Sequence, residues 1–146
     1  MKRILFALVI MILGVSAVSA HDTYSRDASV LPAAAQSFIS KNFKAKVNLV
    51  KIDSKTFGGR EYDVILTDGT EVSFDKSGNW EEIEVGNGRS VPDAIVPELT
   101  RRFIKANHKG TKIVSIERER HGYSIELSNG IDFKTDRNGE FKRYDD

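Results

Sequence analysis

The sequence contains no cysteine. This excludes disulfide bonds, thiol chemistry, cysteine-based metal sites and a lipid anchor on an N-terminal cysteine. A protein of this size without disulfides must be stabilised by its hydrophobic core alone. An excess of one charge is also missing, because 22 basic and 21 acidic residues give a formal net charge of +1. We therefore expect neither a nucleic acid nor an anionic lipid surface as a partner.

A hydrophobic run long enough to span a bilayer is absent as well. The apolar run Ile4–Leu13 is too short to cross a membrane. Lys2 and Arg3 precede it, and the small residues of Val18–Ala20 follow where a signal peptidase would cleave. We predict a signal peptide over residues 1–20, export of the chain, and no stable membrane insertion after cleavage. Loss of the two basic residues would change the formal net charge to −1.

The rest of the sequence contains an internal repeat. Val30–Pro32 aligns with Ile95–Pro97, and the alignment continues to the end of the chain with apolar residues on apolar residues and turn residues on turn residues. The matched pairs include Phe38 with Phe103, Tyr62 with Tyr123, Leu66 with Leu127, Gly69 with Gly130, Asp75 with Asp136, and Trp80 with Phe141. We predict a flexible N-terminus over 21–29, repeat 1 over 30–85, a linker over 86–90 and repeat 2 over 91–146.

Each copy has the pattern of one helix followed by four strands. Pro32 suits a first helical position, and Asp68-Gly69 and Asn129-Gly130 are strong hairpin signals. The strands are expected at 47–53, 62–67, 70–74 and 80–85, and near 112–117, 123–128, 131–135 and 141–144. The predicted fold is α+β, with two tandem helix-plus-four-strand repeats and the helices packed on one face of an antiparallel sheet. The predicted core brings Phe38, Ile39, Phe103 and Ile104 against Tyr62, Val64, Leu66, Tyr123, Ile125 and Leu127.

Short motifs in both copies are typical of one known family. They are Leu31-Pro32, Glu61-Tyr62-Asp63-Val64, Asp68-Gly69, Val72-Ser73-Phe74-Asp75 and Gly78-Asn79-Trp80, then Gly122-Tyr123-Ser124-Ile125-Glu126-Leu127, Asn129-Gly130 and Asp136-Arg137-Asn138-Gly139. With them the chain resembles the PepSY-like family, whose fold is similar to that of the β-lactamase inhibitor protein. The resemblance implies a small periplasmic protein of a Gram-negative bacterium. The family names imply inhibition of peptidases or β-lactamases, but no inhibitory loop can be carried over residue by residue.

No residue pattern in the sequence predicts catalysis. His21, His108 and His121 are not paired with other ligands at metal-binding spacing, and nucleophile and phosphate-loop motifs are missing. The segment Asp75–Asn79 resembles a calcium loop only in part, because it lacks the glycine at the sixth position and the glutamate at the twelfth. It fits a hairpin turn better. We therefore predict no enzyme activity, no cofactor and no metal ligands.

The function predicted from the sequence is a non-catalytic periplasmic binding or inhibitory module for an envelope protein or peptide. Period-2 alternation predicts that the sheet face turned away from the helices is the binding surface. Its candidate residues are Leu49, Asp63, Ile65, Trp80, Glu82, Ile113, Glu126, Lys134 and Phe141. A glycine turn precedes Trp80 and Phe141, and a register shift there would turn both side chains into the core instead. The alternatives are binding of a small ligand or metal ion, and a hydrolase that uses scattered carboxylates.

Overall fold

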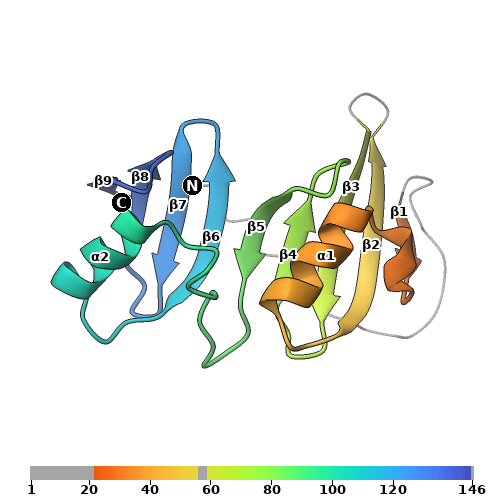
Figure 1. The fold of residues 1–146 in the computed structure, drawn as a ribbon, viewed down its shortest axis with the longest axis horizontal. Coiled ribbons are helices and arrows are strands. Elements are labelled where there is room, and N and C mark those ends of the chain that lie inside the picture. Colours follow the sequence, from red (N-terminus) through yellow and green to blue (C-terminus); the bar gives the residue numbers. More distant parts are fainter. Residues whose placement is uncertain (1–21, 56–58, 146) are drawn as a thin grey trace.

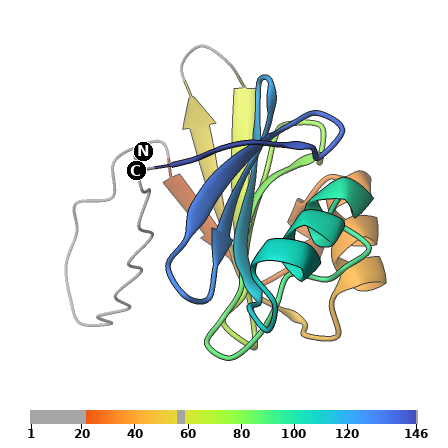
Figure 2. The same cartoon turned by 90° about the vertical axis from the view of Figure 1, so that its left-hand side faces the viewer.

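The computed structural model describes residues 22–55 and 59–145. In this part of the chain, nine strands form one antiparallel sheet whose strand order follows the chain order. The α-helices in the same residues, α1 and α2, both lie on one face of the sheet (Figures 1 and 2). The structure therefore has the α+β class and the one-sided helix arrangement that the sequence predicts. The opposite face, which we call the open face, carries neither helix.

The elements follow one another with short connections, apart from the longer segment 85–97 between β5 and α2. Strand β1 (Asp22–Ser25) and the 3-10 turn η1 (Ala28–Val30) precede helix α1 (Ala33–Asn42). Strands β2 (Val47–Lys55), β3 (Gly59–Leu66), β4 (Glu71–Phe74) and β5 (Trp80–Glu84) come next. Helix α2 (Glu98–Asn107) is followed by β6 (Ile113–Glu119), β7 (Gly122–Leu127), β8 (Asp132–Asp136) and β9 (Phe141–Tyr144). A single pairing, β5 with β6, joins the two halves of the sheet.

Local sequence signals fix the ends of these elements. Pro32 and Pro97 immediately precede α1 and α2 with φ of −54° and −55°, close to the value that the proline ring imposes. The hairpin between β3 and β4 turns at Gly69, whose φ is +82°, and the hairpin between β7 and β8 turns at Gly130, whose φ is +81°. Glycine adopts this left-handed conformation without the steric cost that a side chain brings.

The hydrophobic core lies between the two helices and the sheet. Ile39 of α1 and Ile104 of α2 are buried, and Phe38 and Phe103 pack beside them in partly buried positions. The sheet contributes buried side chains that alternate along its strands, including Tyr62, Val64, Leu66, Val72, Phe74, Ile116, Ile125, Leu127 and Phe133. The core predicted from the sequence is confirmed, because its helix and strand members all belong to this one cluster.

The prediction of a poorly ordered segment over 21–29 is wrong for the residues that the structure describes. Asp22–Ser25 forms β1, which pairs antiparallel with β2 along its whole length. Asp27 then caps η1 by accepting a hydrogen bond from the Ser29 amide at 2.8 Å. The segment has no apolar period, but backbone pairing with the edge of β2 orders it without one.

Three of the predicted outward side chains point toward the helices instead. Phe74 pairs with Trp80 while Ser73 pairs with Glu82, so β5 contains one extra residue, a β-bulge. A bulge turns the residues before it to the other face. The same irregularity in β9 turns Phe141 inward, and one in β6 turns Ile113 inward. Trp80 is only 6% exposed as a result.

The predicted signal peptide, residues 1–20, and His21 lie outside the described residues. Neither α1 nor α2, the α-helices of the described residues, has the length and apolar content needed to cross a bilayer.

Candidate functional site

Side chains on the open face form two rows that cross the sheet at right angles to the strands. Directly paired residues on neighbouring strands point to the same face of the sheet, so the strand register determines which residues form each row. The first row is Tyr24, Lys51, Asp63, Ser73, Glu82, Glu117, Ser124, Lys134 and Arg143. The second row is Leu49, Ile65, Glu71, Glu84, Ser115, Glu126 and Asp132.

Six of the nine candidate residues from the sequence lie in these rows. They are Leu49, Asp63, Ile65, Glu82, Glu126 and Lys134. The other three candidates, Trp80, Ile113 and Phe141, belong to the core or pack against it. Of the five apolar residues predicted for the open face, Leu49 and Ile65 are therefore present, whereas Trp80, Ile113 and Phe141 are absent, so the face is more polar than the sequence analysis expected.

The acidic side chains concentrate on the four central strands. In both rows the strands β3 to β6 contribute Asp63, Glu71, Glu82, Glu84 and Glu117. The same stretch of the two rows contributes no lysine or arginine. Carboxylates on neighbouring strands face each other at about 5 Å between Cβ atoms, where like charges repel. The centre of the open face thus carries a strong negative potential.

The basic residues of the first row stand toward its two ends. Lys51 on β2 places its Nζ 3.5 Å from an Asp22 carboxylate oxygen. On the far side of the sheet, the Lys134 ammonium group donates a hydrogen bond of 2.6 Å to Glu119. Each of these lysines has an acidic neighbour at its own end of the row. The negative charges of the acidic residues between these two lysines are less compensated by basic side chains.

Glu82 and Glu117 pair across the β5–β6 junction at the centre of the first row. Partial burial, followed by repulsion from the Glu117 carboxylate, raises the pKa of Glu82 from 4.5 to about 7. Burial and then Glu119 raise the pKa of Glu117. Within the described residues, neither carboxylate takes part in a hydrogen bond or an ion pair. A cationic group placed here would relieve this repulsion.

The pKa values of two other central acids, Asp63 and Glu71, are also raised. Burial raises the pKa of Asp63, although its carboxylate accepts a hydrogen bond of 2.9 Å from the Ser73 hydroxyl. Burial and then Glu84 raise the pKa of Glu71. A groove of about 320 Å³ follows these acids along the sheet. Six acidic and two basic residues line it, together with Ser73 and Phe74: Asp53, Glu61, Asp63, Glu81, Glu82, Glu117, Lys51 and Arg118.

The candidate list from the sequence omits several residues of the two rows, among them Tyr24 and Glu117. Tyr24 was passed over because its segment was predicted to be unstructured, and no apolar period marks β1. Glu117 was omitted although the alternation around Ile116 places it on the outer face. Continuing that alternation through β6 would have identified Glu117 from the sequence.

The remaining polar candidates have structural roles in this fold. Asp75 Oδ1 accepts hydrogen bonds from the amides of Ser77 and Asn79, as expected of a hairpin turn. His108 Nε2 lies 3.0 Å from the Tyr144 hydroxyl beside the ring of Phe103. Within residues 22–55 and 59–145, no three histidine or acidic side chains are grouped so that they could hold a metal ion.

Comparison with known proteins assigns the chain to a family. Residues 60–143 match the family described as "Putative beta-lactamase-inhibitor-like, PepSY-like". The chain belongs to this PepSY-like family. The match begins in β3 and includes both acidic rows from that strand to β9. Comparison with curated proteins gives no match.

Solved structures of periplasmic proteins are similar to this chain along most of its length. One, from Bacteroides vulgatus, is a "putative periplasmic protein of unknown function"; it is 40% identical, covers 86% of this chain and 99% of its own, and has a TM-score of 0.80. A "putative calcium-regulated periplasmic protein" from Bacteroides thetaiotaomicron is 35% identical, covers 86% and 97%, and has a TM-score of 0.78. A third, a "putative periplasmic protein" from B. vulgatus, is 33% identical, covers 88% and 100%, and has a TM-score of 0.77. This PepSY-like chain is accordingly a periplasmic protein.

Proposed function

We propose that this PepSY-like protein is a non-catalytic binding module that recognises a basic segment of an envelope protein or peptide through its open face. The observation that carries the proposal is the set of central acids on β3 to β6, a stretch of the two rows that contains no lysine or arginine. Lysine or arginine side chains of a partner would supply the missing positive charge. Electrostatic complementarity of this kind directs encounter and selects partners.

Peptide binding provides the test. A fluorescein-labelled peptide of sequence GSKTKSKTG is titrated with the protein by fluorescence anisotropy, beside the neutral peptide GSQTQSQTG. We expect only the basic peptide to bind, and its affinity to fall as NaCl is raised, because salt screens exposed charges. Equal binding of the neutral peptide would contradict the proposal.

Variants of the protein test where on its surface the basic peptide binds. The double variant Glu82→Gln/Glu117→Gln removes the two charges at the β5–β6 junction and should weaken binding of the basic peptide about fivefold, or about 1 kcal/mol. Asp93→Asn is the control, since Asp93 is an exposed acid in the connection before α2. If the control weakens binding as much as the double variant, the site is elsewhere.

We also propose that the two halves of the sheet are copies of one PepSY-like unit. Both halves have a β-bulge near the start of their first strand and another near the start of their last. The turn glycine before the last strand also approaches the first turn of the helix in each half. A Cβ on Gly78 would lie 2.8 Å from the Ala35 amide nitrogen, and one on Gly139 would overlap Pro97.

A second candidate function is calcium binding, which the description of the B. thetaiotaomicron relative as calcium-regulated favours. Calcium prefers carboxylate oxygens, and Glu82 and Glu117 supply them at the β5–β6 junction. Calorimetric titration with CaCl2, with MgCl2 as the comparison, tests this candidate. Binding of calcium that disappears in Glu82→Gln/Glu117→Gln would support it, and the absence of binding would dismiss it.

A further inference from the structure

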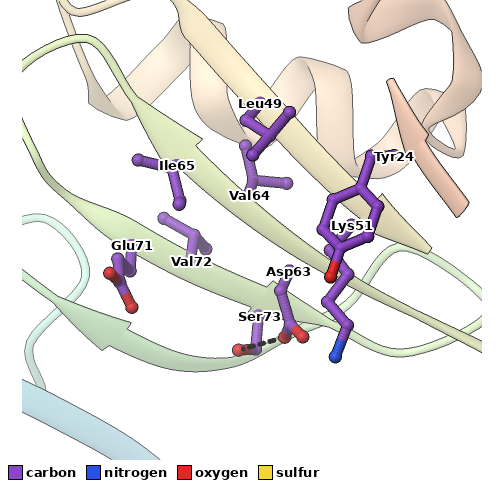
Figure 3. A pocket seen from close by; sticks show the side chains of 9 residues that line it. All are labelled: Tyr24, Leu49, Lys51, Asp63, Val64, Ile65, Glu71, Val72 and Ser73. Carbon is purple, nitrogen blue, oxygen red and sulfur yellow. Dashed lines mark hydrogen bonds between the residues drawn. The ribbon is translucent and has the colours of Figure 1, made fainter. Parts of the chain in front are cut away.

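An apolar pocket opens on the open face beside the acidic rows. Its walls are Leu49 and Ile65, which pair across β2 and β3, and the ring of Tyr24 on β1 (Figure 3). Polar groups surround these apolar walls: Lys51, Asp63, Glu71 and Ser73. The Tyr24 side chain is 50% exposed, although large apolar side chains elsewhere in the described residues are mostly buried.

The inference rests on the proposed function and specifies the partner further. We propose that an apolar side chain of the partner's basic segment packs on the Tyr24 ring over the mouth of this pocket, whose volume of about 20 Å³ is too small to enclose it. This contact would fix the position of the segment's lysine or arginine residues over Glu82 and Glu117. The partner is then an extended segment with an apolar residue close in sequence to basic residues. Electrostatic attraction brings the segment to the open face but does not fix which of its residues lies over which strand. The contact at the pocket fixes that alignment.

The geometry of the sheet sets the spacing of this motif. Neighbouring strands lie about 4.8 Å apart, so the pocket at β2 to β4 and the Glu82–Glu117 pair at β5 and β6 are separated by roughly 12 Å along the rows. An extended peptide rises about 3.3 Å per residue, and its alternate side chains point the same way. A segment lying along the rows would therefore place its basic residues two and four positions from the apolar residue.

The charges of the first row also favour a segment that runs across the strands with its apolar residue at the β2 end. Lys51 stands at the pocket end of the first row, and the acids begin with Asp63 on the next strand. Lys51 lines the pocket beside Asp63 and Glu71, so the pocket offers a basic side chain less net negative charge than the Glu82–Glu117 pair does. An apolar side chain at the pocket shields the exposed Tyr24 ring from water.

Three labelled peptides of equal length test the inference on the full protein. GSFTKTKSG carries the apolar residue and two lysines, GSATKTKSG lacks the apolar side chain, and GSFTETESG reverses the charges. We expect GSFTKTKSG to bind about tenfold more tightly than GSATKTKSG, the effect of burying part of a phenyl ring. The charge-reversed peptide should not bind measurably.

Variants of the pocket complete the design. Tyr24→Ala removes an exposed ring, and Ile65→Thr keeps a β-branched residue in β3 while making the pocket wall more polar. Either change should reduce the preference for GSFTKTKSG over GSATKTKSG to about twofold or less. Leu99→Ala, at an exposed apolar residue of α2, is the matched control and should change neither affinity.

The outcomes separate the inference from the proposed function. Equal binding of GSFTKTKSG and GSATKTKSG would overturn the inference while the proposed function stands. If no basic peptide binds, both fall together. Concentration-dependent self-association that competes with peptide binding would assign the pocket to a second copy of the chain and would also overturn the inference.

Discussion

The indole ring of Trp80 stacks on the phenol ring of Tyr123, with ring centroids 6.3 Å apart and planes inclined by 23°. Trp80 begins β5 and Tyr123 lies on β7, so this contact passes over β6 and ties the two halves of the sheet together on the helix side. Phe38 of α1 stacks on Trp80 at 6.2 Å, and the Arg118 guanidinium carbon lies 4.1 Å from the centre of the Trp80 ring. The aromatic residue expected at a binding surface is instead the main side-chain link across the β5–β6 junction.

The first prediction concerns this link. Trp80→Ala should lower the free energy of unfolding by about 3–5 kcal/mol, because it leaves a large cavity beneath α1 and removes the contact with Tyr123. Urea denaturation followed by circular dichroism measures the loss. Leu99→Ala truncates an exposed apolar side chain and should cost less than about 0.5 kcal/mol. A loss of similar size in both variants would show that Trp80 is not part of the core.

A second prediction concerns the attachment of α2 to the end of the sheet. The buried Thr100 hydroxyl donates a hydrogen bond of 2.8 Å to the Gly139 carbonyl in the turn before β9. Thr100→Val keeps the shape of the side chain but leaves that carbonyl without its donor, which should cost about 1–3 kcal/mol. Thr100→Ser retains the hydroxyl and should be less destabilising. If Thr100→Ser unfolds at a lower temperature than Thr100→Val, the hydrogen bond is not the main contribution of Thr100 to stability.

A third prediction compares two glycines of the second half. A Cβ at Gly122 would overlap the carbonyl oxygen of Thr135 on the neighbouring strand, whereas one at Gly130 would meet no atom within 4 Å. Gly122→Ala should therefore cost at least about 2 kcal/mol, because β7 and β8 must separate to admit it. Gly130→Ala should cost about 1 kcal/mol from its positive φ alone. Chemical denaturation measures both losses. A larger loss of unfolding free energy for Gly130→Ala than for Gly122→Ala would contradict the prediction.

The fourth prediction concerns the pH dependence of stability. Burial, followed by the Glu117 carboxylate, raises the pKa of Glu82 from 4.5 to about 7. Since the folded protein holds this proton more tightly than the unfolded chain, the stability contributed by Glu82 is complete below about pH 4.5. It is lost as the pH rises through about 7. Glu82→Gln cannot ionise and should escape this loss.

Stability curves at several pH values check this. Near pH 4.5 the wild type and Glu82→Gln should unfold at similar denaturant concentrations. At pH 8 the variant should be more stable by about 1 kcal/mol, a value reduced for screening by water because Glu82 is only partly buried. Asp93→Asn should show no comparable gain at pH 8. A wild type that becomes more stable than Glu82→Gln as the pH rises would contradict the prediction.

Most strands of the fold were predictable because their signals are local. Asp68-Gly69 and Asn129-Gly130 specify their hairpins through backbone conformation, and Tyr62, Val64 and Leu66 alternate over a strand. These signals correctly placed the hairpin turns and the strands on either side. They also placed Asp63 and Ile65 on the open face, because β3 runs through that stretch without a bulge.

The sequence by itself therefore determined the two helices and the strands β2 to β9, the one-sided helix arrangement and the inward or outward direction of side chains in regular strands. Only the tertiary structure decided the direction of Trp80, Ile113 and Phe141, because a bulge forms where burying a large side chain against a helix stabilises the fold more than unbroken pairing does. The structure also ordered β1, through backbone hydrogen bonds that leave no pattern in the side chains. The pairing of Glu82 with Glu117 is also decided by the tertiary structure, because it depends on the register of two strands that are separated in the sequence by α2.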